Sequence, residues 1–257
     1  MKRDKGVSRR ALLAGAGSTA ALTVAAGAAA LPRASVRSWD MSTDVLVAGS
    51  GAAGVCAAME ARQSGAEVTL VESLGRLGGS SAMSGGVVYA GGGTALQKSL
   101  GITDSTEQMF NFLMGAGAAH PPQDKVQLYC EESASHFDWL VAQGVSYSEK
   151  FTAAKGLPMG DESLYFSGTE QAWPARDLAV PAPRGHVPGV PGMNGGRSLM
   201  EALLKRVAEL GVRLRTGVAA QRLVVERDGR IAGALVEVNG EQRAIRIRRG
   251  LVLALSL

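Results

Sequence analysis

Residues 43–72 constrain the fold more than any other part of the chain. An apolar segment, residues 45–48, leads directly into the glycine-rich sequence GSGAAG of residues 49–54, and an alanine-rich stretch with helical spacing follows. A second apolar segment, residues 68–71, ends at the acidic side chain of Glu72. This order of strand, glycine-rich turn, helix, strand and acid predicts a βαβ unit that binds a dinucleotide. The alternative is a plain βαβ unit with a glycine-rich turn and no cofactor.

Each residue of this pattern has a physical reason. Gly49 lets the chain turn sharply off the strand, and Gly51 removes a side chain that would block a pyrophosphate. Gly54 lets the helix lie close to the sheet, while the unpaired N–H groups at the start of the helix favour an anion. Glu72 can accept hydrogen bonds from a ribose 2′-hydroxyl, which disfavours a 2′-phosphate at that place.

A second glycine-rich segment helps to decide which of two candidate cofactors, NAD or FAD, this chain binds. Residues 72–86 read ESLGRLGGSSAMSGG, with hydroxyl groups between the glycines. Such a segment can bring backbone N–H groups and serine hydroxyls to a second stretch of the same cofactor. FAD is long enough to need this, because its flavin end lies far from the adenosine. An NAD-binding module is therefore the less favoured alternative.

Three blocks of sequence resemble a known family. GSGAAG at residues 49–54, VTLVE at 68–72 and RLGGSSAMSGG at 76–86 look like the FAD-binding flavoproteins of the fumarate reductase, succinate dehydrogenase and ketosteroid dehydrogenase superfamily. Less specific similarity extends over residues 43–255. The resemblance implies an α/β fold, an FAD-binding Rossmann-like domain of the glutathione reductase type.

The resemblance also implies which residues contact FAD. Ala53 and Gly54 are expected at the diphosphate and Glu72 at the adenosine ribose. The backbone of Ala220 is expected at the adenine, and the serines and glycines of residues 80–86 toward the flavin. The complete predicted cofactor-binding set is Gly49, Gly51, Ala53, Gly54, Glu72, Gly78, Gly79, Ser80, Ser81, Ser84, Gly85, Gly86 and Ala220.

The same resemblance implies an activity. Succinate dehydrogenase flavoproteins carry a histidine in this block that bonds covalently to the flavin, whereas residues 80–85 contain none, so non-covalent FAD is expected. The implied reaction is hydride transfer through flavin N5 to or from a C–C bond of an unsaturated acid or a ketosteroid-like substrate. Tyr89, Arg184 and His186 attract attention, but nothing in the sequence places them beside a flavin, so no catalytic residue is assigned.

The last residues depart from the family pattern. In the family a strand here runs into an ATGG-type turn, whereas this chain continues as Leu255-Ser256-Leu257. Related proteins run to roughly twice this length. We therefore expect residues 43–257 to be an incomplete FAD-binding domain that lacks the capping domain and the return segment around the flavin. The alternative function is a truncated, non-catalytic FAD-binding fragment, or a subunit that needs a partner chain.

The N-terminal residues predict export. Ser8-Arg9-Arg10-Ala11-Leu12-Leu13 is a twin-arginine signature, and the weakly hydrophobic residues that follow end in small side chains suited to a signal peptidase. Residues 1–31 are therefore predicted as a signal peptide, residues 32–42 as a linker, and the location as periplasmic. The alternative, a membrane anchor, is disfavoured because the run is rich in Gly, Ala and Thr.

Charge and composition limit the classes of molecule that this chain is expected to bind. The formal net charge of +4 comes from the first ten residues, which hold five basic side chains and one acidic one. The rest of the chain is close to neutral, so nucleic acid binding has no electrostatic support. The three histidines lack metal-ligand spacing, and the two cysteines read as small buried residues. The expected partners are a small-molecule substrate and either an electron-donor protein or a chain that supplies the C-terminal half.

Periodicity places the other elements. Helices are predicted from the Asp104-Ser105-Thr106-Glu107 capping box through Met114, over residues 123–142, and from Gly196 to about residue 210. Residues 145–195 are rich in proline and are predicted as irregular. Strands at residues 223–227, 231–238 and 244–248 are predicted to form an antiparallel meander with turns at Asp228-Gly229 and Asn239-Gly240.

Overall fold

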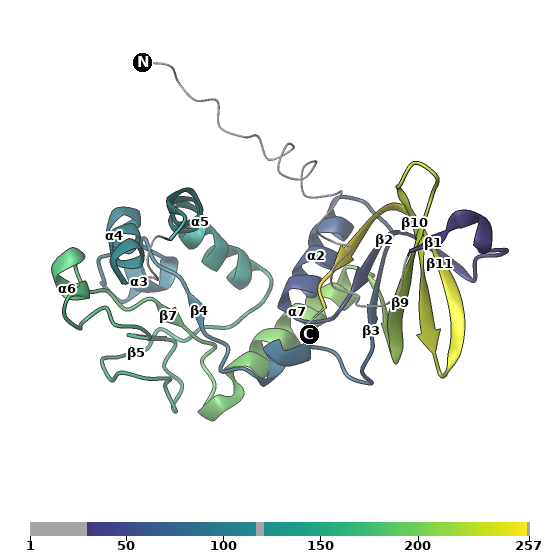
Figure 1. The fold of residues 1–257 in the computed structure, drawn as a ribbon. Coiled ribbons are helices and arrows are strands. Elements are labelled where there is room, and N and C mark those ends of the chain that lie inside the picture. The colour runs from purple at the N-terminus through teal and green to yellow at the C-terminus, as the bar shows by residue number, and fades with distance from the viewer. Residues whose placement is uncertain (1–29, 117–120, 256–257) are drawn as a thin grey trace, which may run out of the picture.

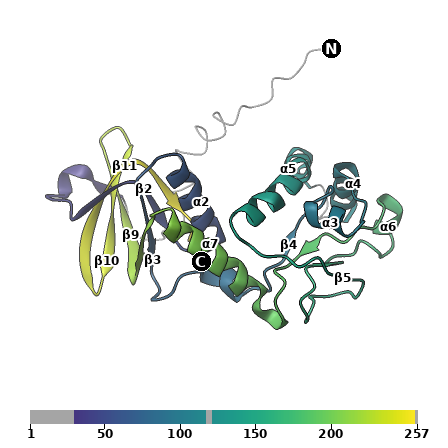
Figure 2. The same cartoon turned by 180° about the vertical axis from the view of Figure 1, so that it is seen from behind.

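The computed structural model describes residues 30–116 and 121–255, which form two lobes (Figure 1). One lobe contains a large sheet, and the other contains most of the short helices and a small sheet. Helices α2 (Ala52–Gln63) and α7 (Gly195–Glu209) lie between the large sheet and the helical lobe in both views (Figure 2). This mixed architecture confirms the predicted α/β fold class. The predicted signal peptide lies almost entirely outside the described residues.

The large sheet combines a parallel part with an antiparallel part. Strands β2, β3 and β8 pair in parallel, and the second half of β11 joins them by pairing in parallel with β2. The first half of β11 pairs with β10 in antiparallel fashion, and β10 pairs likewise with β9. Within the described residues the strand order is β1 (Leu31–Pro32), β9 (Val218–Val225), β10 (Ile231–Val238), β11 (Glu241–Leu253), β2 (Met41–Ala48), β3 (Val68–Glu72) and β8 (Arg213–Thr216).

Two apolar layers hold the sheet lobe together, one on each face of the parallel strands. Successive side chains in a strand point to opposite faces, so Val47 and Leu70 pack against α2 and α7, whereas Leu46 and Val71 pack against the meander. All four side chains are fully or almost fully buried. This alternation explains why residues 45–48 are all apolar and why Thr69 is the single polar residue in 68–71, since both faces are covered.

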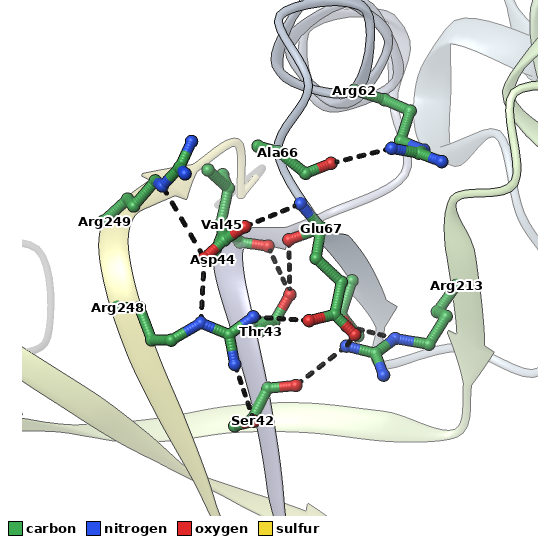
Figure 3. A network of polar contacts seen from close by, with 11 residues as sticks. Ser42, Thr43, Asp44, Val45, Arg62, Ala66, Glu67, Arg213, Arg248 and Arg249 are labelled. Atoms are coloured by element: carbon green, nitrogen blue, oxygen red, sulfur yellow. Dashed lines mark hydrogen bonds and ion pairs between the residues drawn. The ribbon is translucent and has the colours of Figure 1, made fainter.

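An ion-pair network connects neighbouring strands of the large sheet at the edge where β2 and β3 begin (Figure 3). Arg248 of β11 donates to Asp44 of β2 at 2.8 Å and also binds Glu67, which directly precedes β3. Arg213 of β8 binds Glu67 at 2.8 Å and donates to the carbonyl of Ser42. The network joins four strands that are far apart in sequence. Its members are partly exposed, so we assign it a modest share of the stability.

The helical lobe is built around a small four-stranded sheet. Its strand order is β4 (Val88–Tyr89), β7 (Gly185–His186), β6 (Leu164–Tyr165) and β5 (Phe151–Thr152). Phe137 and Leu164 are almost fully buried in the core of this lobe. The helices of the lobe are α3 (Ala95–Ser99), α4 (Thr106–Ala116), α5 (Gln123–Ala142) and α6 (Ala175–Leu178).

The sequence predicted most of these elements, with several differences. For example, β9 covers Val218–Val225, whereas a strand was predicted at residues 223–227. Helix α5 has the predicted bounds, and both residues of the Asn239-Gly240 turn have the positive φ values of a tight hairpin turn. Residues 145–195, predicted as irregular, instead contain β5, β6, β7 and α6. Strand β11 is longer than predicted, and its continuation to Leu253 is what pairs the meander to β2. Residues 32–42, predicted as a linker, include Pro32 of β1 and the start of β2.

No helix among residues 30–116 and 121–255 has the length and apolar character needed to cross a membrane.

Candidate cofactor site

The first glycine-rich turn leaves β2 and enters α2 through two positions that only glycine fits. Gly49 has φ +104°, and a Cβ there would lie 2.3 Å from the carbonyl oxygen of Ala254. A Cβ at Gly54 would lie 2.0 Å from the carbonyl oxygen of Gly49. Gly51 differs, because the nearest atom to its Cβ position is the hydroxyl of Ser81 at 3.6 Å. Neighbouring backbone therefore leaves no room for a side chain at Gly49 or Gly54, whereas the Cβ position of Gly51 is not crowded.

The residue that follows β11, Ala254, packs against this glycine-rich turn. The N–H of Ala254 donates to the carbonyl of Ala48 at 2.8 Å, which brings residue 254 against Gly49. The sequence departs here from the family's ATGG-type turn, yet the backbone up to Leu255 packs beside the glycine-rich turn.

Glu72 lies at the end of β3 and is almost fully buried. Its Oε2 accepts hydrogen bonds from the N–H of Ser50 at 3.0 Å and from the Ser50 hydroxyl at 2.6 Å. Its Oε1 accepts from the N–H of Leu74 at 2.9 Å and from the Ser73 hydroxyl at 3.2 Å. Burial opposes ionisation, but these hydrogen bonds outweigh it and lower the pKa of the carboxyl. Glu72 is thus an ionised group that organises the turn.

The second glycine-rich segment packs directly on the first. The N–H of Gly78 donates to the Ser50 hydroxyl at 3.0 Å, and the N–H of Ala52 donates to the Ser81 hydroxyl at 3.1 Å. Ser81 belongs to a short 3-10 helix, Gly79–Met83, whose position places this hydroxyl at the start of α2. Ser80 in the same segment is exposed. The sequence predicted both serines toward the flavin, and the observed contact of Ser81 is with the N-terminus of α2.

Other predicted residues contact the start of α7 or the core beside the antiparallel meander. Gly85 and Gly86 lie against the start of α7, where a Cβ on Gly86 would lie 2.2 Å from the backbone carbon of Gly195. Ser84 accepts a hydrogen bond from the N–H of Gly196 at 3.1 Å through its carbonyl. Ala220 lies in β9 and packs against the core between the meander and the parallel strands. The turn before β9 is tied to the residues after Glu72, because the N–H of Gly217 donates to the carbonyl of Leu74 at 3.1 Å.

These residues fit a dinucleotide diphosphate. The first turn of α2 has no side-chain cap at Gly51, and the first N–H groups of a helix have no partners within it. Ser81 satisfies the N–H of Ala52, which leaves the N–H groups of Ala53 and Gly54 as donors for an anion. Apart from its two chain neighbours, no residue has a backbone atom within 4 Å of the Cβ position of Gly51, so backbone does not crowd this side of the turn.

A buried polar network in the helical lobe contains Arg184 and His186, two of the three residues that attracted attention in the sequence. The third, Tyr89, has a buried hydroxyl with no hydrogen-bond partner among the described residues. Arg184 is fully buried and forms two hydrogen bonds with Asp104, at 2.7 and 2.9 Å. The Nε2 atom of His186 lies 2.9 Å from the Thr94 hydroxyl. Burial lowers the pKa of His186 to about 4, so its imidazole is neutral at pH 7. Burial also raises the pKa of Tyr89, so its hydroxyl stays protonated.

No group of three or more His, Cys, Asp or Glu side chains within residues 30–116 and 121–255 could hold a metal ion. Cys56 and Cys130 are both free thiols. Burial raises the pKa of each to about 11.

Comparison with known proteins identifies the class. Residues 44–256 match the FAD binding domain family, so the chain belongs to that family of flavoproteins. The match confirms the predicted FAD cofactor and the resemblance stated from the glycine-rich blocks. It favours FAD over NAD, which the βαβ pattern alone leaves open.

Particular relatives are ketosteroid dehydrogenases and fumarate reductases. The chain is 35% identical over 219 residues to a 3-oxo-5-alpha-steroid 4-dehydrogenase from Comamonas testosteroni, covering 82% of this chain and 41% of that protein. It superposes with a TM-score of 0.84 and 41% identity on the 3-ketosteroid-Δ4-(5α)-dehydrogenase of Rhodococcus jostii, covering 87% of this chain and 48% of the other. A flavocytochrome c3 fumarate reductase matches at 28% identity and a TM-score of 0.67, covering 84% and 34%. The chain spans less than half the length of these relatives.

One residue that links the two glycine-rich turns was missed by the sequence reasoning. Ser50 occupies a position of the glycine-rich pattern that accepts any residue type, and no role was predicted for it. In the structure its hydroxyl contacts both Glu72 and the second segment. The available signal was a hydroxyl side chain beside two glycines, but its partners lie 22 and 28 residues away and cannot be read from local sequence.

Proposed function

We propose that this chain holds FAD and is itself active as a dehydrogenase or reductase on a C–C bond near the carbonyl group of a ketosteroid-like substrate. The observation that supports this most strongly is the 41% identity and TM-score of 0.84 to a 3-ketosteroid dehydrogenase over 87% of the chain. An unsaturated acid is the other substrate class, supported by the more distant similarity to a fumarate reductase.

The residues of the chain would hold and orient the cofactor. The N–H groups of Ala53 and Gly54 would bind the diphosphate, and the positive end of the α2 dipole would stabilise its charge. Glu72 would set the position of the turn and face the adenosine ribose, and Ala220 would lie toward the adenine. FAD supplies a hydride acceptor or donor at the flavin N5. The residues between Gly79 and Gly86 contain no histidine, which supports non-covalent binding.

The test is a flavin-binding and reduction assay on the full chain. Binding of FAD would be followed by flavin fluorescence, and acid precipitation would then show whether the flavin is released. Bound flavin would next be mixed under anaerobic conditions with a saturated 3-ketosteroid, and in a parallel reaction with succinate. We expect release of the flavin by acid and bleaching of its absorbance by the steroid. Tight FAD binding with no bleaching by either compound would contradict the proposed activity of this chain.

A second candidate function is a FAD-binding part whose catalytic site is completed by a further polypeptide segment. It is supported by the relatives' length, of which this chain spans 41% and 48% in the two steroid enzymes. Co-expression with the C-terminal half of the Comamonas testosteroni relative tests it. Bleaching by the steroid only in the co-expressed sample would support this candidate over the first.

The predicted location is also a proposal. Residues 8–13 carry the twin-arginine signature, and that route exports proteins already folded around a cofactor. Intact mass of the protein recovered from a periplasmic fraction tests this. Loss of about the first 30 residues is expected, and an uncleaved cytoplasmic protein would contradict it.

A further inference from the structure

The hydroxyl of Ser50 is a fully buried link between the two glycine-rich segments. Ser50 has no exposed surface, and its hydroxyl lies 2.6 Å from Oε2 of Glu72 and 3.0 Å from the backbone nitrogen of Gly78. These two partners come from different parts of the chain. Glu72 is the last residue of β3, and Gly78 directly precedes the short 3-10 helix Gly79–Met83.

The direction of both hydrogen bonds follows from the chemistry of the groups. An ionised carboxylate only accepts hydrogen bonds, so the single Ser50 proton must be donated to Glu72. A backbone N–H only donates, so the Ser50 oxygen accepts from Gly78. The chain of donors therefore runs from Gly78 through Ser50 to Glu72, with no alternative arrangement of the protons.

The Glu72 carboxylate is already fully engaged by the protein. Two donors reach each of its oxygens, from Ser50 on Oε2 and from Ser73 and Leu74 on Oε1. A carboxylate offers about four acceptor positions. A ribose hydroxyl can therefore bind Glu72 only by displacing a donor, and the longest of these bonds is the 3.2 Å contact from Ser73. The stronger bonds, including the one to the Ser50 hydroxyl, have a structural role.

We propose that Ser50 is a positioning residue of the FAD site, which uses Glu72 as its anchor to hold residues 78–81 against the start of α2. With Gly78 held in place, the Ser81 hydroxyl reaches the N–H of Ala52 at 3.1 Å. The two segments then present one diphosphate site formed by α2 and the second segment together. This inference rests on the proposed FAD contacts at α2.

A comparison of two serine variants in the full chain tests the inference. Ser50→Ala removes the link, whereas Ser73→Ala removes a hydroxyl from the same carboxylate without removing a partner of Gly78. The first measurement, made without FAD, is hydrogen exchange of the backbone amide of Gly78. We expect exchange to be at least about tenfold faster in Ser50→Ala, because a buried amide loses its acceptor, and unchanged in Ser73→Ala.

The second measurement is the FAD dissociation constant by flavin fluorescence. We expect an increase of about tenfold in Ser50→Ala. We expect no such increase in Ser73→Ala, because a bound ribose hydroxyl would displace the Ser73 hydrogen bond to Glu72. If Ser50→Ala does not fold, Ser50→Cys fills the same buried position with a much weaker hydrogen-bonding group, and the same changes are expected in it. Unchanged Gly78 exchange in the folded variant would overturn the link. Faster exchange with unchanged FAD affinity would overturn the positioning role and leave the proposed function intact.

Failure of the proposed FAD binding, on which this inference rests, gives a different result. The unmodified chain would then not bind FAD, while Gly78 exchange would still respond to Ser50→Ala.

Discussion

The buried histidine of the helical lobe makes the stability of this protein depend on pH. His186 is fully buried, and its ring lies against Phe137 with ring centres 4.6 Å apart. Burial lowers its pKa from 6.5 to about 4, while Asp104 is a nearby charge that acts in the opposite direction. In the unfolded chain the imidazole has its ordinary pKa and takes up a proton near pH 6.5. The unfolded state therefore binds more protons than the folded state between these two pH values.

The sign and size of the effect follow from linkage. A group with a lowered folded pKa stabilises the fold fully above pH 6.5, and this contribution is lost as the pH falls toward 4. The gap between the two pKa values corresponds to about 3 kcal/mol of folding free energy. Between pH 7 and pH 5 the expected loss from His186 alone is about 2 kcal/mol.

Urea unfolding at pH 7 and pH 5 measures this loss. The matched variant is His186→Gln, which keeps a polar side chain near Thr94 but cannot ionise. Carboxyl groups elsewhere titrate in both proteins, so the difference between the two pH dependences isolates the histidine. We expect the unmodified protein to lose about 2 kcal/mol more than the variant over this interval. Equal losses in both proteins would refute the buried, neutral state of His186.

Three further predictions follow from packing and charge. Gly54→Ala places a methyl group 2.0 Å from the Gly49 carbonyl, so we expect a stability loss of about 1–3 kcal/mol and weaker FAD binding. Gly75→Ala, which has nothing within 4 Å of the new Cβ, should change neither property in thermal unfolding and FAD titration. Phe137→Ala should cost about 3–5 kcal/mol in urea unfolding, since this ring is only 2% exposed. Arg248→Ala should lower the melting temperature at low salt, and the difference should shrink at 1 M salt, where exposed ion pairs are screened; a salt-independent difference would contradict the ionic origin.

The sequence predicted the elements whose signals are local. Residues 45–48 and 68–71 are buried on both faces and are therefore predominantly apolar, and the Asn239-Gly240 dipeptide can adopt the left-handed conformations that a tight turn needs. Helix α5 was predicted with its observed bounds, because apolar side chains recur along it at helical spacing.

The elements that were not predicted depend on distant partners. Strands β5, β6 and β7 are two residues long and exist because they pair with one another and with β4, so no periodicity marks them. The ion pair between Arg184 and Asp104 joins residues 80 positions apart. Both features require the fold before they can be recognised.

The candidate site divides in the same way. Steric positions such as Gly49 and Gly54 were predicted because a known pattern requires glycine there, and the structure shows the close contacts behind it. The contact between the Ser81 hydroxyl and the start of α2 was not predictable, because the position of that hydroxyl depends on how residues 78–81 pack against α2.

The measurement that tests the central claim most directly is the absorption spectrum of the purified full chain after incubation with FAD and desalting. The structure predicts a flavin band that survives desalting and moves into the supernatant on acid precipitation, because the site at α2 is formed by the described residues themselves. A colourless protein after desalting would contradict the claim that this chain holds FAD on its own.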